Sequence, residues 1–377
     1  MMLSEEQNII RDQVRAYVKA NITPHAAEWD KNNTFPAQVL SELGELGLYG
    51  MTTPEQWGGA GLGYQELVLA LEEIAAGDGA CSTILSVNNS VVCGPLLGYG
   101  SDFLKETYLK DLASGRKLGC FCLTESQAGS DAAAIKTRAI RDGDTYIING
   151  SKQFITSGQN AQVAIVFAVT DPAAGKRGIS AFIVPTDNAG YQVAGIEHKL
   201  GQHASDTATL CFTDCRIPAN HLLGKAGEGY KIALSNLESG RMGIAAQSVG
   251  MARAAYEAAL AYAQERMSFG KPLIEHQAVA FRLADMATQI EAARLLVWQA
   301  ASLRDAGQPC LKEASMAKLF ASEMAEKVCS AAIQTLGGYG YLHDFPVERI
   351  YRDVRVAQIY EGTSDIQRMV IARELVR

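Results

Sequence analysis

The sequence is poor in aromatic residues and has no excess of positive charge. Of its 377 residues 7% are aromatic, and 34 Lys and Arg stand against 41 Asp and Glu, a formal net charge of −7. Proteins that bind nucleic acid usually present a basic stripe with interleaved aromatic side chains, and this sequence has none. The composition therefore argues against nucleic-acid binding and favours a soluble protein.

The residue spacings of metal sites and disulfide frameworks are also missing. The six histidines show no His-x-x-x-His or Glu-x-x-His pattern, and the eight cysteines form no Cys-x-x-Cys pair. Cys120 and Cys122 alternate as strand residues do, whereas Cys211 and Cys215 have no matching His or Cys cluster. We expect no protein metal site, and buried free thiols in a reducing compartment.

Long hydrophobic runs and a targeting segment are absent too. No stretch approaches the ~20 apolar residues of a membrane span. Residues 1–7 lack a basic-then-apolar signal region, and Ser4 followed by Gln7 fits a capping box that begins a helix. We therefore expect a cytoplasmic protein with no membrane span.

The sequence contains three regions that differ in hydrophobic periodicity and composition. At 377 residues it is also longer than a chain that usually forms a single hydrophobic core. Residues 1–118 show apolar residues at helical spacing, 119–224 short apolar strands and turn signals, and 225–377 long Ala-rich helices. We predict a mainly α fold with a central β domain. It has an N-terminal helical domain (1–118), a β-barrel-like middle domain (119–224) and a C-terminal up-down four-helix bundle (225–377).

The periodicity also predicts individual elements. The Gly-rich loop 58–63 follows no strand, so we interpret it as a turn and not as a phosphate cradle. Expected helices cover residues 64–76, 230–266, 277–305 and 311–336, with a last segment after Ser364. Expected strands cover 118–123, 144–150, 163–169, 179–184 and 207–212.

Two strand ends carry hydroxyl groups. The loop 124–131 is rich in small and hydroxyl residues, whose N–H and O–H groups suit a ring carbonyl or a phosphate. Phe154 and Thr156 end the next strand, where an aromatic ring could pack on a flat heterocycle and a hydroxyl could bond its edge. Taken alone, each segment is more typical of a decorated turn or of core packing.

Near the C-terminus, residues 360–367 place Glu361 on a glycine-hinged turn between apolar stretches. Such surroundings disfavour the charged form, so the pKa of Glu361 is expected to rise towards neutrality. Alone, the segment is more typical of a loop that ends in a Ser or Thr helix cap.

Upstream, Gly240 and Gly243 lie on either side of Arg241 in a predicted helix. Each glycine destabilises a helix by about 1 kcal/mol relative to Ala. A bulky group close to the helix backbone would explain that cost, and so would helix–helix contact.

In this order, the segments resemble those of the acyl-CoA dehydrogenase family, over essentially the whole chain. Residues 86–90, 94–101 and 119–121 look like the short-chain (butyryl-CoA) branch. The matching blocks are Leu3-Ser4-Glu5-Glu6-Gln7, Glu72-Glu73-Ile74, Leu123-Thr124-Glu125, Ala128-Gly129-Ser130-Asp131, Asn149-Gly150-Ser151-Lys152, Ile155-Thr156, Arg266, Phe269-Gly270-Lys271, Gln277, Gln334, Leu336-Gly337-Gly338 and Tyr360-Glu361-Gly362-Thr363.

The resemblance implies FAD between the β domain and the C-terminal bundle, in a homotetramer (a dimer of dimers) whose subunits share the FAD sites. It implies flavin contacts from Phe121, Leu123, Thr124, Ser130, Phe154 and Thr156, contacts to the partner's FAD from Arg266, Phe269, Gln277, Gln334, Gly337 and Gly338, and further contacts from Thr363 and Asp365. It implies substrate contacts from Ser130, Glu238, Arg241, Tyr360 and Gly362.

The implied reaction is α,β-dehydrogenation of a fatty acyl-CoA, here a short one, to the trans-2-enoyl-CoA. Glu361 would act as general base while a hydride leaves for the flavin, and electrons would pass to an electron-transfer flavoprotein. The N–H of the base would help to bind the thioester oxygen. Some members place the base just before the equivalent of Arg241, where this chain has Gly240. Glu238 lies on a different helical face, which leaves Glu361.

Two departures concern loop geometry: Ser126-Gln127 replaces the usual Pro-Gly, which predicts a less rigid loop, and Phe154 stands where Trp is common. Two other functions stay open. One is a flavin oxidase or monooxygenase on the same fold. The other is a non-catalytic protein that binds acyl-CoA or flavin, although such a protein would be expected to lose Glu361 or the flavin threonines.

Overall fold

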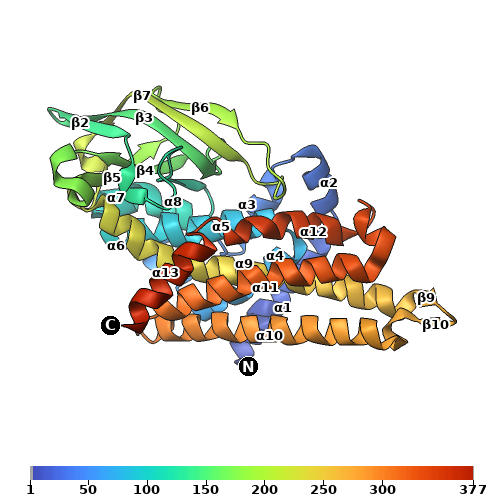
Figure 1. Ribbon diagram of the computed structural model, residues 1–377. Coiled ribbons are helices and arrows are strands. Elements are labelled where there is room, and N and C mark those ends of the chain that lie inside the picture. The colour runs from blue at the N-terminus through green and yellow to red at the C-terminus, as the bar shows by residue number, and fades with distance from the viewer. Residues whose placement is uncertain (1–2, 377) are drawn as a thin grey trace.

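Helices at both ends of the chain pack together beneath a central sheet domain. The computed structural model describes residues 3–376, and Figure 1 shows the sheet above a layer of long, nearly parallel helices. The order along the chain is helical, β, helical, so the predicted fold class is confirmed.

The N-terminal helical region begins where the capping box predicted. The Ser4 side chain accepts from the Gln7 backbone N–H, and the Gln7 side chain accepts from the Ser4 N–H. The helices of this region are α1 (Glu5–Asn21), α2 (Ala26–Asn32), α3 (Ala37–Glu45), η1 (Glu55–Trp57), α4 (Tyr64–Gly77), α5 (Gly79–Val87), η2 (Asn88–Cys93), α6 (Gly94–Tyr99), α7 (Asp102–Leu104), η3 (Lys105–Leu109) and α8 (Lys110–Ala113).

The stretch Gly79–Tyr99 corrects the expectation that no stretch approaches the apolar length of a membrane span. It is a continuous helix of 21 residues with a mean hydropathy of 1.3, long and apolar enough by length and composition to cross a membrane. However, 83% of its apolar window is buried inside the protein, as in the core helix of a globular domain. The sequence conceals this helix because two asparagines interrupt the apolar run. The side chains of Asn88 and Asn89 bond to backbone groups of neighbouring segments and are buried at little cost.

The β domain consists of two layers that meet at one parallel contact, Arg138 with Val169. The strand order is β6-β7-β3-β2-β4-β5-β8, with β1 beside β4, and the path is open at β6 and β8. The strands and short helices are β1 (Gly119–Cys122), η4 (Ala132–Ala134), β2 (Arg138–Asp142), β3 (Thr145–Thr156), β4 (Val163–Val169), η5 (Pro172–Gly178), β5 (Ile179–Pro185), β6 (Tyr191–Ile196), β7 (Thr207–Pro218), η6 (Ala219–His221) and β8 (Leu222–Leu223). Sequence reasoning missed β2 and β6 because almost all of their residues are exposed, which leaves no apolar alternation.

The C-terminal region contains three long helices whose predicted bounds agree with the structure to within one residue. The Tyr64–Gly77 helix α4 packs against two of them, so the helical regions share a core. The elements are α9 (Gly229–Glu265), β9 (Met267–Ser268), β10 (Lys271–Pro272), η7 (Leu273–Glu275), α10 (Gln277–Asp305), α11 (Leu311–Leu336), η8 (Gly337–Tyr341), α12 (Pro346–Val354), η9 (Arg355–Gln358) and α13 (Ser364–Leu375).

Glycines in α9 allow its neighbours to approach closely. A Cβ atom at Gly250 would lie 2.2 Å from the carbonyl oxygen of Glu72 in α4, and one at Gly243 would lie 2.2 Å from Ser86 Oγ in α5. Helix–helix contact therefore explains Gly243 and Gly250. Gly240 has a different neighbour, which belongs to the candidate site.

Candidate active site

Glu361 lies on a strained turn between η9 and α13. Its backbone φ is +55°, and that of Gly362 is +87°, so two consecutive residues are left-handed. This conformation is costly for glutamate but open to glycine. A side chain at Gly362 would also collide with Gln367, because its Cβ would lie 2.8 Å from Nε2. The Thr363 hydroxyl caps α13 by accepting from the Ile366 N–H, so the predicted helix cap is confirmed.

Side chains from three elements hold this turn. Gln367 Nε2, in α13, donates to the carbonyl oxygens of Glu361 (3.1 Å) and Gly362 (2.8 Å). Lys318 Nζ, in α11, donates to the Gly362 carbonyl at 2.7 Å. The Tyr360 hydroxyl donates to Gln247 in α9. Such over-determined contacts keep a strained backbone in place.

The Glu361 carboxylate lies directly over the backbone of Gly240. A Cβ at Gly240 would lie 2.6 Å from Glu361 Oε1 and 2.7 Å from Oε2. Any other residue at 240 would displace the carboxylate, which explains the glycine in the middle of α9. The Oε2 atom is buried and has no hydrogen-bond partner among residues 3–376. It is available to a group that enters the site.

Burial raises the pKa of Glu361 to about 7, against 4.5 for an ordinary glutamate, while the cations Arg241 and Lys318 oppose the rise. A carboxyl group of this pKa takes and releases protons near neutral pH, as a general base must. The backbone N–H of Glu361 has no acceptor within the described chain. A donor and a base therefore sit side by side on one turn.

Arg241 and Glu238, which the resemblance assigned together to the substrate, have different partners in the structure. Arg241 is buried, and its guanidinium donates to Ser315 Oγ at 3.3 Å, whereas its Nε has no partner in the described chain. The Glu238 carboxylate instead accepts from Arg304 at 3.2 Å and from the Cys310 thiol at 3.0 Å. Of the two, Arg241 acts on Glu361 directly.

A bulge in β3 turns Phe154 outward. Its pairing with β7 shifts register between Lys152 and Ile155, and Phe154 has a left-handed φ of +59°. Phe154 is therefore 58% exposed, although Lys152 and Ile155 on the same strand are buried. Thr156 ends the strand with a hydroxyl that bonds to no other described residue. An outward-turned aromatic residue and a free hydroxyl thus lie two residues apart at the end of β3.

A buried ion pair, which sequence reasoning missed, holds the loop after β1. Lys152 Nζ lies 2.8 Å from Glu125 Oε1 and 3.0 Å from the Leu123 carbonyl. Burial alone would raise the pKa of Glu125, but Lys152 and backbone N–H donors lower it to about 2. Gln127, which replaces a glycine of the usual Pro-Gly, donates to Glu125 Oε2 at 2.7 Å and to the Ala134 carbonyl at 3.3 Å. These side-chain bonds brace the loop where a proline would have stiffened it.

The groups around this loop suit a flat, polar-edged ligand. The hydroxyls of Thr124, Ser130 and Thr156 have no partners in the described part of the chain, and Ser157 Oγ is buried without one. Phe121 packs on Phe167 at a centroid distance of 4.8 Å, and the Leu123 side chain is buried in the core. Unpaired donors beside an exposed aromatic ring are what a flavin edge and face require.

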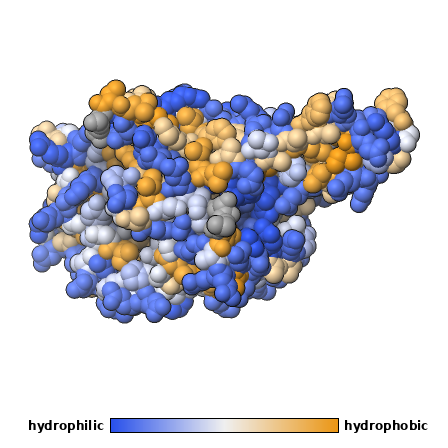
Figure 2. Space-filling view, turned by 90° about the horizontal axis from the view of Figure 1, so that it is seen from below, coloured by the Kyte–Doolittle hydropathy of each residue, from blue (hydrophilic) through white to orange (hydrophobic). Residues whose placement is uncertain are grey.

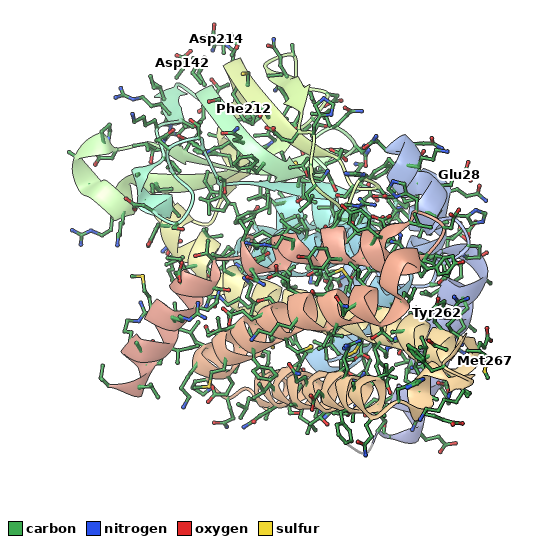
Figure 3. All side chains as sticks on the ribbon, turned by 45° about the vertical axis from the view of Figure 1, so that its right-hand side comes forward. Glu28, Asp142, Phe212, Asp214, Tyr262 and Met267 are labelled. Carbon is green, nitrogen blue, oxygen red and sulfur yellow. The ribbon has the colours of Figure 1, made fainter. Side chains whose placement is uncertain are left out.

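The remaining predicted residues lie at the opposite end of the bundle. From Arg241 to the end of α9 at Glu265 is 24 residues, about 36 Å of helix at 1.5 Å per residue. Figure 3 shows Tyr262 and Met267 at that end, far from Asp142 and Asp214 on the sheet. A hollow of about 430 Å³ there is lined by Tyr262, Arg266, Ser268, Leu273, Thr335, Leu336, Gly337, Gly338, Tyr339 and Leu342.

The second group is exposed and largely unpartnered. Phe269 is 96% exposed at the tip of the β9–β10 hairpin, and Gln277 and Gln334 are also exposed. Arg266 lies over the Tyr339 ring, 5.6 Å from its centroid. Cβ atoms at Gly337 and Gly338 would meet nothing within 4 Å. One chain therefore divides the predicted FAD residues into two groups that it does not bring together.

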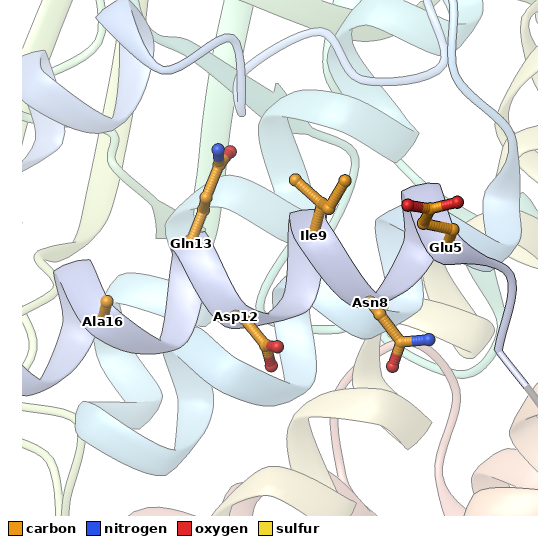
Figure 4. Close-up of a pocket in the computed structure, with 6 residues that line it drawn as sticks. All are labelled: Glu5, Asn8, Ile9, Asp12, Gln13 and Ala16. Atoms are coloured by element: carbon orange, nitrogen blue, oxygen red, sulfur yellow. The ribbon is translucent and has the colours of Figure 1, made fainter.

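Other surfaces of the described chain offer less chemistry. A shallow hollow along α1, shown in Figure 4, is lined by one exposed helix face: Glu5, Asn8, Ile9, Asp12, Gln13 and Ala16. Ile9 is its one large apolar side chain. Among residues 3–376, no group of three or more His, Cys, Asp and Glu side chains could hold a metal ion.

Comparison with known proteins decides the family. Profiles of the N-terminal, middle and C-terminal domains of acyl-CoA dehydrogenases match residues 4–116, 120–215 and 227–376. The chain belongs to the acyl-CoA dehydrogenase family. It is 47% identical to an acyl-CoA dehydrogenase of Bacillus subtilis (strain 168) over 100% of this chain and 99% of that protein. It is also 47% identical to the mitochondrial short-chain specific acyl-CoA dehydrogenase of Homo sapiens, over 100% and 91%.

Solved structures agree with this assignment. Butyryl-CoA dehydrogenase from Megasphaera elsdenii superimposes with a TM-score of 0.98 at 40% identity, and the match covers 100% of both chains. Members of the family depend on FAD. The free hydroxyls, the unpartnered Ser157 and the outward Phe154 of this acyl-CoA dehydrogenase fit that cofactor.

The structure thus brings Tyr360, Glu361, Gly362, Thr363 and Arg241 together. Asp365 lies just beyond them, exposed and paired with Arg368 at 3.5 Å. Sequence reasoning missed three supports of the turn, which are Lys318, Gln367 and Gln247. One signal was available for Lys318: it is a charged residue among the small residues Ala314, Ser315, Ala317, Ala321 and Ser322 of a helix face.

Proposed function

We propose that the protein catalyses FAD-dependent α,β-dehydrogenation of a short-chain acyl-CoA to the trans-2-enoyl-CoA and passes electrons to an electron-transfer flavoprotein. The observation that carries the proposal is the Glu361 carboxylate, buried over Gly240 with its pKa raised to about 7. The short chain length rests on the relatives named short-chain specific acyl-CoA dehydrogenase and butyryl-CoA dehydrogenase. A solved structure of the electron transferring flavoprotein of Acidaminococcus fermentans contains a chain 44% identical to this one, with a TM-score of 0.99.

Each residue at the site has a definite task in this reaction. Glu361 takes the α-proton at its unpaired oxygen, while its backbone N–H donates to the thioester carbonyl. Arg241 and Lys318 favour the ionised carboxylate that must be present before proton transfer. Thr124 and Thr156 would hold the flavin ring by its edge, and Phe154 would pack on its face. FAD, when bound, supplies the redox chemistry by accepting the hydride from the β-carbon.

A chain-length series tests this proposal. Purified protein is mixed anaerobically with straight acyl-CoA thioesters from C3 to C12 and with branched analogues, and bleaching of the flavin absorbance is recorded. We expect the fastest bleaching with C4 and a steep fall with longer chains. Turnover with an artificial acceptor but not with oxygen would exclude the oxidase or monooxygenase alternative. Binding of FAD and acyl-CoA without any bleaching would instead support a non-catalytic role.

We further propose a homotetramer, a dimer of dimers in which each FAD site takes residues from two chains. The division of the predicted FAD residues between two ends of α9 supports it. Figure 2 shows apolar residues on the projecting arm at the right, the end that carries β9 and β10 in Figure 1. Exposed apolar side chains of this region are Met267, Phe269, Tyr339, Tyr341 and Leu342. Light scattering with flavin quantification should give four chains and four FAD molecules per particle.

A cytoplasmic location is proposed as well, supported by the eight cysteines, all free. Seven of them are buried and Cys211 is half-buried. Fractionation of the producing cells, with the flavoprotein followed by its absorbance, tests this location.

The reverse reaction is a second candidate. The acryloyl-CoA reductase (NADH) of Anaerotignum propionicum is 44% identical over 100% of this chain and 95% of that protein. The same base in its protonated form would return the α-proton to an enoyl-CoA. Measuring both directions with one dye couple, at matched thioester concentrations, separates the two physiological assignments.

A further inference from the structure

Lys318 is a fully buried lysine that the reaction does not use directly. It lies in the first third of α11 and is 0% exposed. Its ammonium group has one acceptor among residues 3–376, the Gly362 carbonyl at 2.7 Å. A buried ammonium with a single hydrogen bond is costly, so its retention requires a compensating interaction.

The helix around Lys318 brings its ammonium group to the turn. The hydroxyls of Ser315 and Ser322 bond to their own helix at the carbonyls of Leu311 (2.8 Å) and Leu319 (3.3 Å). These short side chains allow the turn to approach the α11 backbone closely. Figure 1 shows α13, which begins just after the turn, lying against one end of α11. Lys318 is the long side chain that spans the remaining distance.

The bond meets the turn at its most strained point. Glu361 and Gly362 both have positive φ, and the Gly362 carbonyl accepts from Lys318 and from Gln367. Holding this carbonyl fixes the Gly362–Thr363 peptide, while the bond from Gln367 to the Glu361 carbonyl fixes the peptide between Glu361 and Gly362. The carboxylate then stays over Gly240.

We propose that Lys318 is a positioning residue for the base: it anchors the Glu361–Gly362 turn through the Gly362 carbonyl and supplies a buried positive charge that favours the ionised carboxylate. This inference rests on the proposed role of Glu361 as general base and adds a residue to it. Gln367 shares the anchoring, but its amide carries no charge.

The charges around the turn come from several elements. Arg241 in α9 acts on the carboxylate together with Lys318, and Glu238 and Arg373 act in turn on Arg241. Burial lowers the pKa of Lys318 to about 8, while Glu361 raises it and Arg241 lowers it. Glu323 of α11 also raises it. Lys318 is therefore mostly charged in the pH range where Glu361 titrates.

The sign of the effect follows from these charges. Since a nearby cation favours the carboxylate, removal of Lys318 raises the pKa of Glu361, and the base is then protonated over a wider pH range. The loss of activity relative to the wild type should therefore be largest at low pH. Above pH 9 the wild-type lysine is itself neutral and Glu361 is ionised in both proteins, so only the anchoring defect remains.

The first experiment compares Lys318→Met with Lys318→Gln, which keeps a donor without the charge. The rate of flavin reduction at saturating butyryl-CoA is measured from pH 5.5 to 9.5. In both variants we expect the midpoint of the acid limb to rise by about one pH unit, a tenfold change in the ionised fraction. Lys318→Met should show an additional loss of rate at every pH. Lys327→Met, on the exposed face of α11, is the matched control and should keep the wild-type midpoint.

The outcomes are distinct. Unchanged midpoints in both variants, with an active wild type, would overturn the inference about Lys318 and leave the proposed function intact. If none of the acyl-CoA thioesters reduces the flavin of the wild type, the proposed function itself is overturned.

A second measurement does not depend on activity. Urea unfolding at pH 8 is recorded for the wild type, Lys318→Met, Glu361→Gln and the double variant. We expect Lys318→Met to destabilise the wild type more than it destabilises Glu361→Gln, because Glu361→Gln lacks the carboxylate that interacts with the lysine. Equal effects in the two backgrounds would contradict a charge interaction between Lys318 and Glu361.

Discussion

The two ends of α9 differ in how much of a site one chain builds. At one end, Glu361 rests over Gly240, and the turn that carries it is held by Lys318, Gln367 and Gln247 of the same chain. At the other end, Phe269 is 96% exposed, and the glycines 337 and 338 face open space. The acid–base group is thus complete within one chain, whereas the residues at the other end have few partners among residues 3–376.

The difference follows from burial. A charged group in an apolar site must find its partners within the folded chain, because an unpaired buried charge is too costly. In the proposed oligomer, the residues that would meet another subunit remain exposed in one chain and need no internal partner. Variants at the two ends should therefore fail in different ways.

The largest effect is expected at the base. Glu361→Gln keeps the shape of the side chain but removes the proton acceptor, so flavin reduction by butyryl-CoA should slow by about 10³-fold or more. Bound FAD and the assembly state should be unchanged, as measured by absorbance and light scattering. Glu265→Gln, an exposed carboxylate at the end of α9, serves as the control. Wild-type turnover in Glu361→Gln would overturn the assignment of the base.

The next effect concerns the space above Gly240. In Gly240→Ala the new Cβ would lie 2.6 Å from Glu361 Oε1, so the carboxylate must move. A displacement of about 1 Å can lower the rate about 100-fold, and stopped-flow flavin reduction measures it. Gly98→Ala, in helix α6, is the matched control because its Cβ would meet nothing within 4 Å. Equal rates in the two variants would mean that the contact over Gly240 is unimportant.

These two residues illustrate what sequence reasoning could reach. The long helices were predictable because their apolar periodicity and stop signals are strong, and Glu361 was predictable because its motif recurs in a family order. The choice between helix contact and a bulky group at Gly240 required the positions of residues 121 apart in sequence. Sequence reasoning did not predict the roles of Lys318 and Lys152, because lysine side chains are usually exposed and only the fold shows that these two are buried.

A smaller effect is expected at the open end. Arg266→Ala combined with Phe269→Ala removes an exposed cation and an exposed ring, so the assembly should retain FAD at least about tenfold more weakly. Dialysis at low protein concentration, followed by flavin absorbance, measures this loss. Ile140→Ser, which replaces a side chain 63% exposed on β2, should retain FAD normally. Unchanged retention in the double variant would show that this end does not contribute to the cofactor site.

The smallest effect is a pH-dependent difference in stability. The pKa of Glu361 is raised from 4.5 to about 7, so the folded protein binds this proton more tightly than the unfolded chain does. Ionising Glu361 therefore reduces stability progressively between about pH 4.5 and 7, and the loss is constant above that range. Glu361→Gln should gain stability over the wild type at pH 8 but little at pH 4.5, measured by urea unfolding. A gain that does not depend on pH would contradict the raised pKa.

Mixed assemblies test the comparison between the two ends most directly. One copy carries Glu361→Gln, the other carries Arg266→Ala with Phe269→Ala, and differently tagged copies are produced together and purified as mixed oligomers. If each site takes its base from one chain and Arg266 and Phe269 from the partner, a mixed pair contains one site with both halves intact. After dialysis that strips FAD from the parent carrying Arg266→Ala with Phe269→Ala, butyryl-CoA dehydrogenation in the mixed oligomers should rise well above that of either parent, towards about half of the wild-type activity. Activity no higher than the sum of the two parents would contradict a site shared between chains.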